Sequence, residues 1–226
     1  MIELYHCVSA RSFRALWMLE ELGLPYQLRM LPFPPRAFAK EYLALNPLGT
    51  VPLLIDGPSR LTESSACCQY LASKAPAQHL DVAPDDTAYG SYLNWLHMAD
   101  ATLTFPQTLV LRYRFFEPGP RRQPQVADDY ERWFLGRLRA VEAAAQTLPA
   151  DAPYLCAGRF TAADVAVGYA LMLSDYLGMS AQWGPATQNY WMGLQQRAAF
   201  LRSLEAEKQA ALAQNVDPIP SPLIRP

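Results

Sequence analysis

The chain is poor in histidine and cysteine, and its positive and negative charges nearly cancel. It has three histidines and four cysteines in 226 residues, and Cys7, Cys67, Cys68 and Cys156 do not have metal-ligand spacing. We therefore expect no metal site and no disulfide framework, and reduced thiols fit a cytoplasmic protein. The balance of 19 basic and 21 acidic residues, without a basic run, disfavours nucleic acid as a partner.

Long apolar runs are also missing. No stretch reaches about 18 apolar residues, so we expect no membrane span. The beginning, MIELYHC, has no basic segment followed by an apolar one, so we expect no secretory signal and a cytoplasmic location by default. The hydrophobic content of 51% and aromatic content of 12% instead predict a folded chain with one large or two modest cores.

The first part of the chain alternates strand and helix patterns. Residues 2–6 alternate as a strand, residues 12–22 have apolar positions at helical spacing, and residues 25–30 form the next strand, with a parallel right-handed crossover. A short helix over 36–45 follows, and Asn46 to Gln69 supplies two strands and the start of another helix. The predicted order is β-α-β-α-β-β-α.

Strand patterns vanish after a proposed linker over 75–86. The rest predicts an all-helical domain over 88–214 and a proline-rich tail over 215–226. Thr161, with Asp164 three residues later, predicts a capping box at the start of one helix. The other expected helices are a long one over 87–116 that Pro106 interrupts, and helices over 126–148, 187–198 and 199–214.

The most informative stretch is Asn46 to Gln69, NPLGTVPLLIDGPSRLTESSACCQ. Pro52 stands where a strand needs a backbone donor, so it is either a trans residue at the strand start or part of a cis bond. A cis bond would turn the N–H and C=O of Val51 toward an extended peptide. The pair Glu63-Ser64 opens a helix, whose N-terminus attracts a carboxylate. Both features suit one small peptide.

This stretch resembles the glutathione transferase superfamily, of bacterial cytosolic type, over roughly residues 1–212. The resemblance implies a thioredoxin-like glutathione-binding domain over 1–78 followed by the helical bundle. Glutathione would be the cosubstrate, the partner a small hydrophobic electrophile, and the assembly a homodimer. By the resemblance, Val51 before cis-Pro52 pairs with the cysteinyl backbone of glutathione, and Glu63 with Ser64 grips its γ-glutamyl end.

The glutathione sulfur should meet the turn from Cys7 to Ser12. The thiolate is the nucleophile, and hydroxyl donors there would lower the pKa of the thiol. Relatives place a serine a few residues before the Phe-Arg of the first helix, and here Ala10 holds that position with Ser9 beside it. Ser9 is our first candidate and Ser12 the second, because Ser12 also fits an N-cap. Arg11 either stabilises the thiolate or a glutathione carboxylate, or points into solvent.

Other candidate residues lie further along the chain. Many relatives carry a lysine directly before the Val-Pro, where this chain has Thr50, and Lys40 and Arg36 are the candidates to replace that cation. His6 is interpreted as a packing residue. The electrophile pocket is expected along the first long helix of the second half, although an aromatic stripe also fits a core. Its candidate residues are Phe105, Arg112, Tyr113 and Phe116.

Two alternatives stay open at this point. A non-enzymatic interaction module fits Ala10 and Thr50, but it has no need of the Val-Pro and Glu-Ser features. A glutathione-dependent isomerase or thiol-disulfide reductase would use Cys7, which lacks the second cysteine of a C-x-x-C motif.

Overall fold

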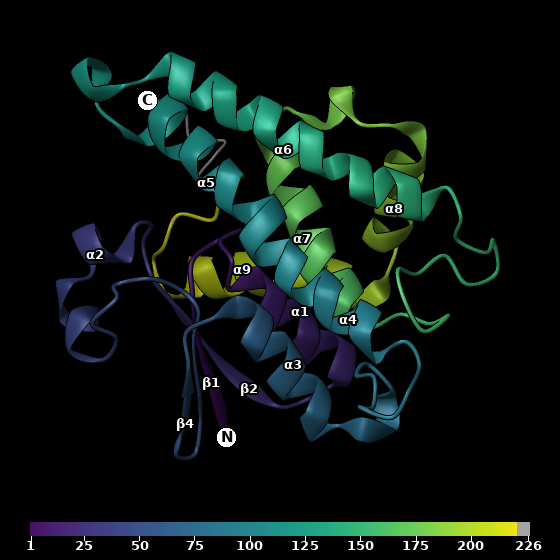
Figure 1. Cartoon of the computed structure of the whole chain (residues 1–226). Coiled ribbons are helices and arrows are strands. Elements are labelled where there is room, and N and C mark those ends of the chain that lie inside the picture. The colour runs from purple at the N-terminus through teal and green to yellow at the C-terminus, as the bar shows by residue number, and fades with distance from the viewer. Residues whose placement is uncertain (221–226) are drawn as a thin grey trace. The chain divides into compact units, whose positions relative to one another are not determined.

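The computed structural model describes residues 1–220, which form two compact units (Figure 1). The first unit comprises residues 1–81 and the described residues from 195 onward, and the second comprises residues 82–194.

A four-stranded sheet is the centre of the first unit. Its strands are β1 (Ile2–His6), β2 (Tyr26–Met30), β3 (Leu53–Asp56) and β4 (Ser59–Leu61). Their order is β2-β1-β3-β4, with β1 and β2 parallel and the other neighbours antiparallel. The predicted crossover and the thioredoxin-like α/β order are therefore confirmed.

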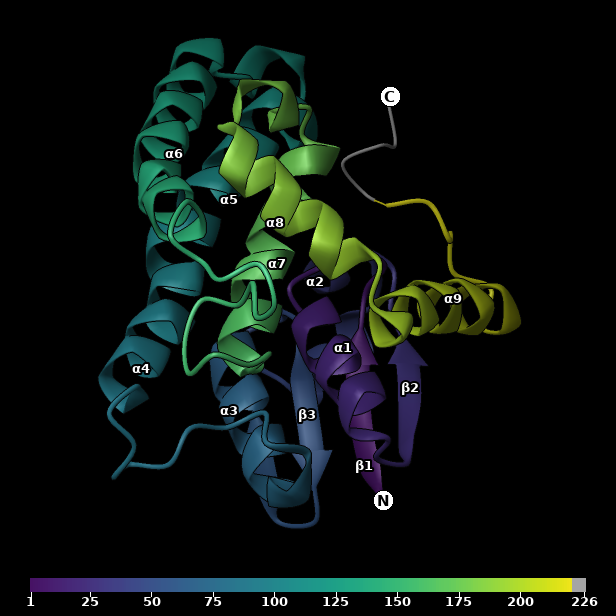
Figure 2. The same cartoon turned by 90° about the vertical axis from the view of Figure 1, so that its right-hand side faces the viewer.

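Three helices pack around this sheet. α1 (Phe13–Leu22) and α3 (Ser64–Lys74) contact each other, and α9 (Ala198–Ala213) contacts α1 and β2 (Figure 2). The ring of Phe200 lies 4.9 Å from the ring of Trp17, and Trp17 is fully buried. Burial of this aromatic contact joins the C-terminal helix to the core of the first unit.

Local sequence signals predict some helix boundaries correctly and others wrongly. α1 ends at Gly23, whose φ of 64° is left-handed, as expected for a glycine that follows a helix. The predicted single helix over 36–45 is wrong: α2 covers only Pro35–Phe38, and a 3-10 turn covers Lys40–Ala44. The two pieces are separated because Ala39 has non-helical angles, with φ −134° and ψ 68°.

The second unit is built from helices alone. The predicted interruption near Pro106 takes the form of a π-helical segment over Met98–Thr104, directly before the proline-containing turn. A second π-helical segment covers Arg112–Phe116. The α-helices are α4 (Tyr89–His97), α5 (Phe105–Leu111), α6 (Pro124–Ala145), α7 (Ala162–Tyr176) and α8 (Pro185–Gln195).

The predicted capping box opens α7. The Ala163 N–H donates to Thr161 Oγ1 at 3.3 Å, and the Thr161 N–H donates to Asp164 Oδ2 at 2.9 Å. Asp164 also accepts from the Tyr190 hydroxyl at 2.8 Å. Burial raises the pKa of Asp164, although its hydrogen bonds oppose the shift. The box thus joins α7 to α8 as well as starting the helix.

Within residues 1–220, no helix has the length and apolar character needed to cross a bilayer. In the predicted tail, residues 221–226 lie outside the described residues.

Candidate functional site

Strand register directs three predicted segments to the same end of the sheet. The last pair of β1 with β3 is Tyr5 with Leu53, so the turn after β1 lies at the same end of the sheet as the Val51-Pro52 bond that precedes β3. Leu61, the last residue of β4, pairs with Leu54 near the beginning of β3, so α3, which follows β4, begins near this end as well. The turn after β1, the residue before Pro52 and the beginning of α3 therefore converge.

Val51 is buried directly before β3, and its bond to Pro52 is cis. Among the described residues, neither the N–H nor the C=O of Val51 has a backbone hydrogen-bond partner. The carbonyl of Thr50 accepts from the Tyr42 hydroxyl and from Asn46 Nδ2, each at 2.9 Å. These bonds fix the loop that presents the Val51 backbone.

The beginning of α3 combines a charged and a neutral polar side chain. Glu63 is the exposed N-cap residue, and its carboxylate makes no capping bond. Ser64 is buried, and its Oγ accepts a 2.8 Å hydrogen bond from Nη1 of Arg14. Because Oγ accepts from Arg14, the serine can donate its own proton to a further acceptor.

Arg14 is one residue of the candidate site to which our sequence reasoning assigned no role. It lies on α1 and is fully buried. A buried guanidinium is costly without hydrogen-bond partners, so such a residue usually serves a specific contact. The signal was present in the sequence, because Arg14 lies between Phe13 and Ala15 in a helix whose other positions are mostly apolar.

The two candidate hydroxyls belong to one buried network. The Ser9 N–H donates to Glu207 Oε2 at 2.9 Å, and Ser9 Oγ donates to Glu207 Oε1 at 3.2 Å. His6 Nε2 lies 2.9 Å from Glu207 Oε2, and His6 Nδ1 lies 2.7 Å from Ser12 Oγ. Sequence reasoning assigned no role to Glu207, which lies on α9.

This network determines what the hydroxyls can contact. Ser9 is 3% exposed and Ser12 is fully buried. Ser12 occupies the N-cap position of α1 but makes no side-chain capping bond, because its hydroxyl pairs with His6. Ala10 and Arg11, in the same turn, are half-buried. Of the two serines, Ser9 is therefore the one with any exposed surface.

Cys7 is not arranged as a reactive thiol. It is fully buried, and its Sγ lies 3.8 Å from the carbonyl oxygen of Pro32. Burial raises the pKa of the Cys7 thiol far above its ordinary range. The thiolate is the reactive form, so this cysteine is held unreactive.

Arg36 and Lys40, the candidates to replace the lysine that relatives carry before the Val-Pro, lie on different elements. Arg36 and Lys40 are both exposed, on α2 and at the start of the 3-10 turn. A Cβ added to Gly49 would lie 2.8 Å from Arg36 Cβ, so Arg36 packs closely against the loop that leads to Val51. Gly49 also has a φ of 59°, which favours glycine.

The predicted pocket residues lie on α5 and on the π-helical segment that follows it. Phe105 is 53% exposed, and Phe116 is also exposed. Arg112 pairs with Glu117 at 2.8 Å and lies 5.3 Å from the centre of the Tyr113 ring. Aromatic and cationic surface is thus present on this segment.

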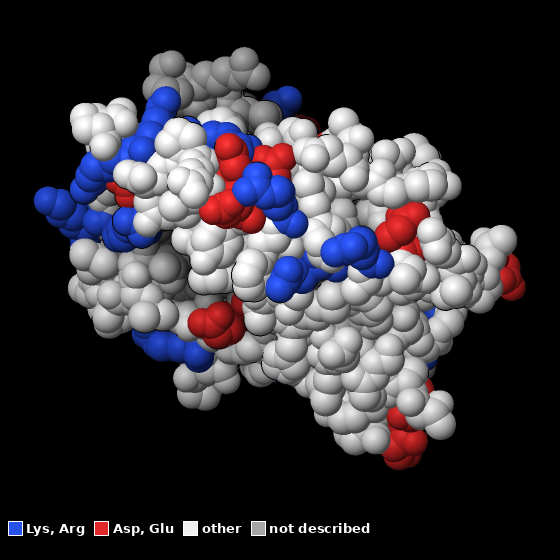
Figure 3. Space-filling view, turned by 45° about the horizontal axis from the view of Figure 1, so that its top comes forward, with Lys and Arg blue, Asp and Glu red and all other residues white. Residues whose placement is uncertain are grey.

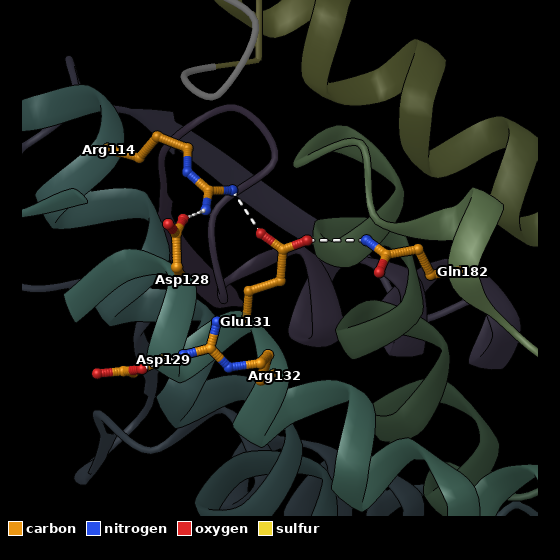
Figure 4. Close-up of polar contacts among 6 residues, drawn as sticks. All are labelled: Arg114, Asp128, Asp129, Glu131, Arg132 and Gln182. Carbon is orange, nitrogen blue, oxygen red and sulfur yellow. Dashed lines mark hydrogen bonds and ion pairs between the residues drawn. The ribbon is translucent and has the colours of Figure 1, made fainter. Parts of the chain in front are cut away.

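A polar network holds the same segment against α6 (Figure 4). Arg114 donates to Asp128 at 2.6 Å and to Glu131 at 2.7 Å, and the second oxygen of Glu131 accepts from Gln182 at 2.8 Å. Basic and acidic side chains are interspersed on the face shown in Figure 3, with wide areas that carry neither. The network fixes the backbone that carries Arg112 and Tyr113.

Comparison with known proteins identifies relatives of both parts. Residues 8–74 match the family described as Glutathione S-transferase, N-terminal domain. Glutathione S-transferase hmp2 of Hypomyces subiculosus is 31% identical over 144 residues, which cover 59% of this chain and 68% of that protein. Glutathione S-transferase 3 of Schizosaccharomyces pombe is 32% identical over 103 residues, or 46% of this chain. In that match the chain spans only 43% of the relative's length.

A solved structure resembles nearly the whole chain. The structure described as a ternary complex of BphK, a bacterial GST, is 26% identical in sequence and has a TM-score of 0.78. The superposition covers 90% of this chain and 98% of that one. The combination of a thioredoxin-like unit and a helical unit is therefore shared.

Proposed function

Since this chain belongs to the glutathione S-transferase family, we propose that it binds glutathione and joins the thiolate sulfur to a small hydrophobic electrophile. The observation that carries this proposal is the convergence of three segments at one end of the sheet. They are the turn after β1, the unpaired backbone of Val51, and the Arg14–Ser64 contact at the beginning of α3.

The beginning of α3 suits the γ-glutamyl end of glutathione. That end carries one carboxylate and one ammonium group. Ser64 has a proton to donate to the carboxylate, and the positive charge of Arg14 and the N-terminus of α3 favour an anion there. The exposed carboxylate of Glu63 suits the ammonium group. In this arrangement the γ-glutamyl carboxylate lies near the positive charge of Arg14, and the ammonium group lies near the negative charge of Glu63.

The Val51 backbone suits the cysteinyl residue. An extended peptide that lies along a sheet edge pairs through main-chain hydrogen bonds. Val51 offers one N–H and one C=O for this purpose. Arg36, which packs near this loop, and Lys40 are the proposed cations for the remaining glycyl carboxylate.

The reaction needs the thiol to release its proton to solvent water before it attacks. The thiolate forms a bond to the electrophilic carbon, and an aryl halide would release its halide with the bonding electrons. We place the sulfur beside the turn from Cys7 to Ser12, with Ser9 as the proposed hydroxyl and Ser12 as its alternative. Arg11 is the proposed cation of this turn, and Phe105, Arg112 and Tyr113 the proposed wall for the electrophile.

Replacement of Glu63 tests the glutathione site. Glu63→Ala removes the charged acceptor for the γ-glutamyl ammonium, and we expect a loss of about 2 kcal/mol or more in binding, roughly thirtyfold in Kd. Titration calorimetry measures this loss, with Glu205→Ala as the control, because Glu205 is an exposed glutamate on α9. Equal Kd values for wild type and Glu63→Ala would refute the placement.

One observation favours a second function, a glutathione-binding protein without transferase activity. Ser9 and Ser12 both direct their hydroxyls into the buried network, and Ala10 holds the position of the usual serine. Turnover with 1-chloro-2,4-dinitrobenzene separates the two functions. Glutathione binding without conjugation would support the non-catalytic function, and conjugation that depends on the enzyme would exclude it. Homodimer formation and cytoplasmic location stay predictions.

A further inference from the structure

Glu207 connects the C-terminal helix to the turn where the sulfur is placed. Although 198 residues separate it from Ser9 in sequence, its carboxylate accepts from both the N–H and the hydroxyl of Ser9. Its Oε2 also contacts Nε2 of His6, the last residue of β1. The carboxylate of Glu207 therefore contacts three polar groups, one from His6 before Cys7 and two from Ser9 after it.

The carboxylate is nearly inaccessible, because Glu207 is only 3% exposed. Removing a carboxylate from water is costly unless donors replace the water, and hydrogen bonds to a charged acceptor are stronger than neutral ones. Here two of the donors, the N–H and the hydroxyl of Ser9, come from the turn itself. The folded helix α9 therefore favours one conformation of the turn, in which Ser9 has a φ of 54°. Non-glycine residues adopt this left-handed conformation rarely.

A different role, a hydrolytic Ser-His-Glu triad, does not fit the same atoms. Ser12 contacts His6 at 2.7 Å, and His6 contacts Glu207 at 2.9 Å, which is the order of contacts in such a triad. A nucleophile must reach its substrate, however, and Ser12 has no exposed surface. The network is therefore suited to holding the turn.

We propose that Glu207 is a positioning residue of the glutathione site, a role that rests on the proposed function. It holds the turn from Cys7 to Ser12 through the N–H and the hydroxyl of Ser9, so that the turn meets the glutathione sulfur in one fixed geometry. A displacement of about 1 Å at a reacting atom can reduce turnover up to a hundredfold. The γ-glutamyl and cysteinyl contacts lie on α3 and at Val51, so they do not depend on Glu207.

Glu207→Gln tests this role while conserving the size of the side chain. Glutamine offers one acceptor oxygen in place of two, so at least one of the three donors loses its partner. Glu205→Gln is the matched control, because Glu205 is an exposed glutamate on the same helix whose side chain accepts a hydrogen bond from Gln209. If Glu207→Gln does not fold, Glu207→Asp keeps the charge and shortens the side chain.

Three measurements separate positioning from general structural damage. In Glu207→Gln we expect the Ser9 amide to exchange its hydrogen at least about tenfold faster. We expect kcat with 1-chloro-2,4-dinitrobenzene to fall about tenfold or more. The Kd for glutathione should stay within about twofold of wild type, because the binding contacts are elsewhere. Glu205→Gln should match wild type in all three.

The outcomes for this role and for the proposed function differ. If wild type binds glutathione and turns over, but Glu207→Gln keeps wild-type kcat or wild-type Ser9 exchange, Glu207 is not a positioning residue and the proposed function stands. A parallel loss of kcat and glutathione affinity would also overturn the role, because it would indicate general damage. If wild type binds no glutathione, or binds it without turnover, transfer is not its reaction and both fail together.

Discussion

Arg14 on α1 donates a 2.8 Å hydrogen bond to the hydroxyl of Ser64, the first residue of α3, and both side chains are buried. The pair joins two helices that contact each other in the first unit. It also places a positive charge beside a hydroxyl whose proton is available to a ligand. The same contact thus serves both the packing of the unit and the proposed γ-glutamyl site.

Ser64→Ala should therefore impair both properties. We expect the Kd for glutathione to rise at least about tenfold, because a donor to the glutamyl carboxylate is lost. The free energy of unfolding should fall by about 1–3 kcal/mol, because a buried charged donor loses one acceptor. Ser73→Ala on the same helix is the control, since that exposed hydroxyl donates to the Tyr70 carbonyl within its own helix. Wild-type affinity in Ser64→Ala would remove Ser64 from the glutathione site.

The two serines of the first turn should behave differently. Ser9→Ala keeps the backbone bond to Glu207 and removes only the hydroxyl, so we expect kcat to fall more than glutathione affinity. Ser12→Ala removes the partner of a buried histidine nitrogen, so we expect about 1–3 kcal/mol of lost stability. Steady-state kinetics and denaturant unfolding measure both. A loss of kcat in Ser12→Ala with unchanged stability would assign the sulfur to Ser12 instead.

Cys7 should not take part in the reaction. Burial raises the pKa of its thiol, which keeps it protonated at neutral pH. We expect Cys7→Ser to retain glutathione-dependent turnover within about threefold, and a thiol reagent to label Cys7 only as fast as the protein unfolds. Burial also raises the pKa of Cys156 to about 11, so slow labelling is expected there as well. Rapid labelling of Cys7, or loss of activity in a folded Cys7→Ser, would favour the thiol-disulfide alternative.

Sequence reasoning succeeded where the deciding interactions are local. Gly23 ends α1, and Thr161 with Asp164 begins α7, because each boundary depends on residues within one helical turn. The single helix over 36–45 failed because Ala39, an ordinary helix former, takes a non-helical conformation between two short pieces. Local propensity does not predict that break.

The residues of the candidate site also divide into those that a local motif indicates and those that depend on contacts between distant parts of the chain. As site residues, Val51, Glu63 and Ser64 were predicted from a continuous motif. Glu207 was not, because its contact with Ser9 spans 198 positions and its own helix reads as an ordinary amphipathic one. Arg14 was missed although a charge between the apolar residues Phe13 and Ala15 was visible.

A stability prediction concerns the second unit. Glu142 on α6 accepts from the N–H and the hydroxyl of Thr187, each at 2.8 Å, at the beginning of α8. Burial alone would raise the pKa of Glu142, but these hydrogen bonds outweigh it and hold the pKa below its ordinary range. A depressed folded pKa stabilises the protein above the unfolded value of about 4.3, and this stabilisation is lost as the pH falls through the folded value.

Glu142→Gln should accordingly lose about 1 kcal/mol of unfolding free energy at pH 7, the ordinary cost of a lost N-terminal cap. The difference from wild type should shrink as the pH falls below about 4. Denaturant unfolding at a series of pH values measures it, with Glu205→Gln as the control. A difference that stays constant from pH 7 to pH 3 would show that the charge of Glu142 is not what stabilises α8.

Calorimetric titration of the wild-type protein with glutathione, with thiolate absorbance followed against pH, tests the account most directly. A free thiol has a pKa of about 8.5. We predict saturable binding, and a thiolate band of bound glutathione that appears well below pH 8. The absence of binding would contradict the assignment of Val51, Glu63, Ser64 and Arg14 to a glutathione site.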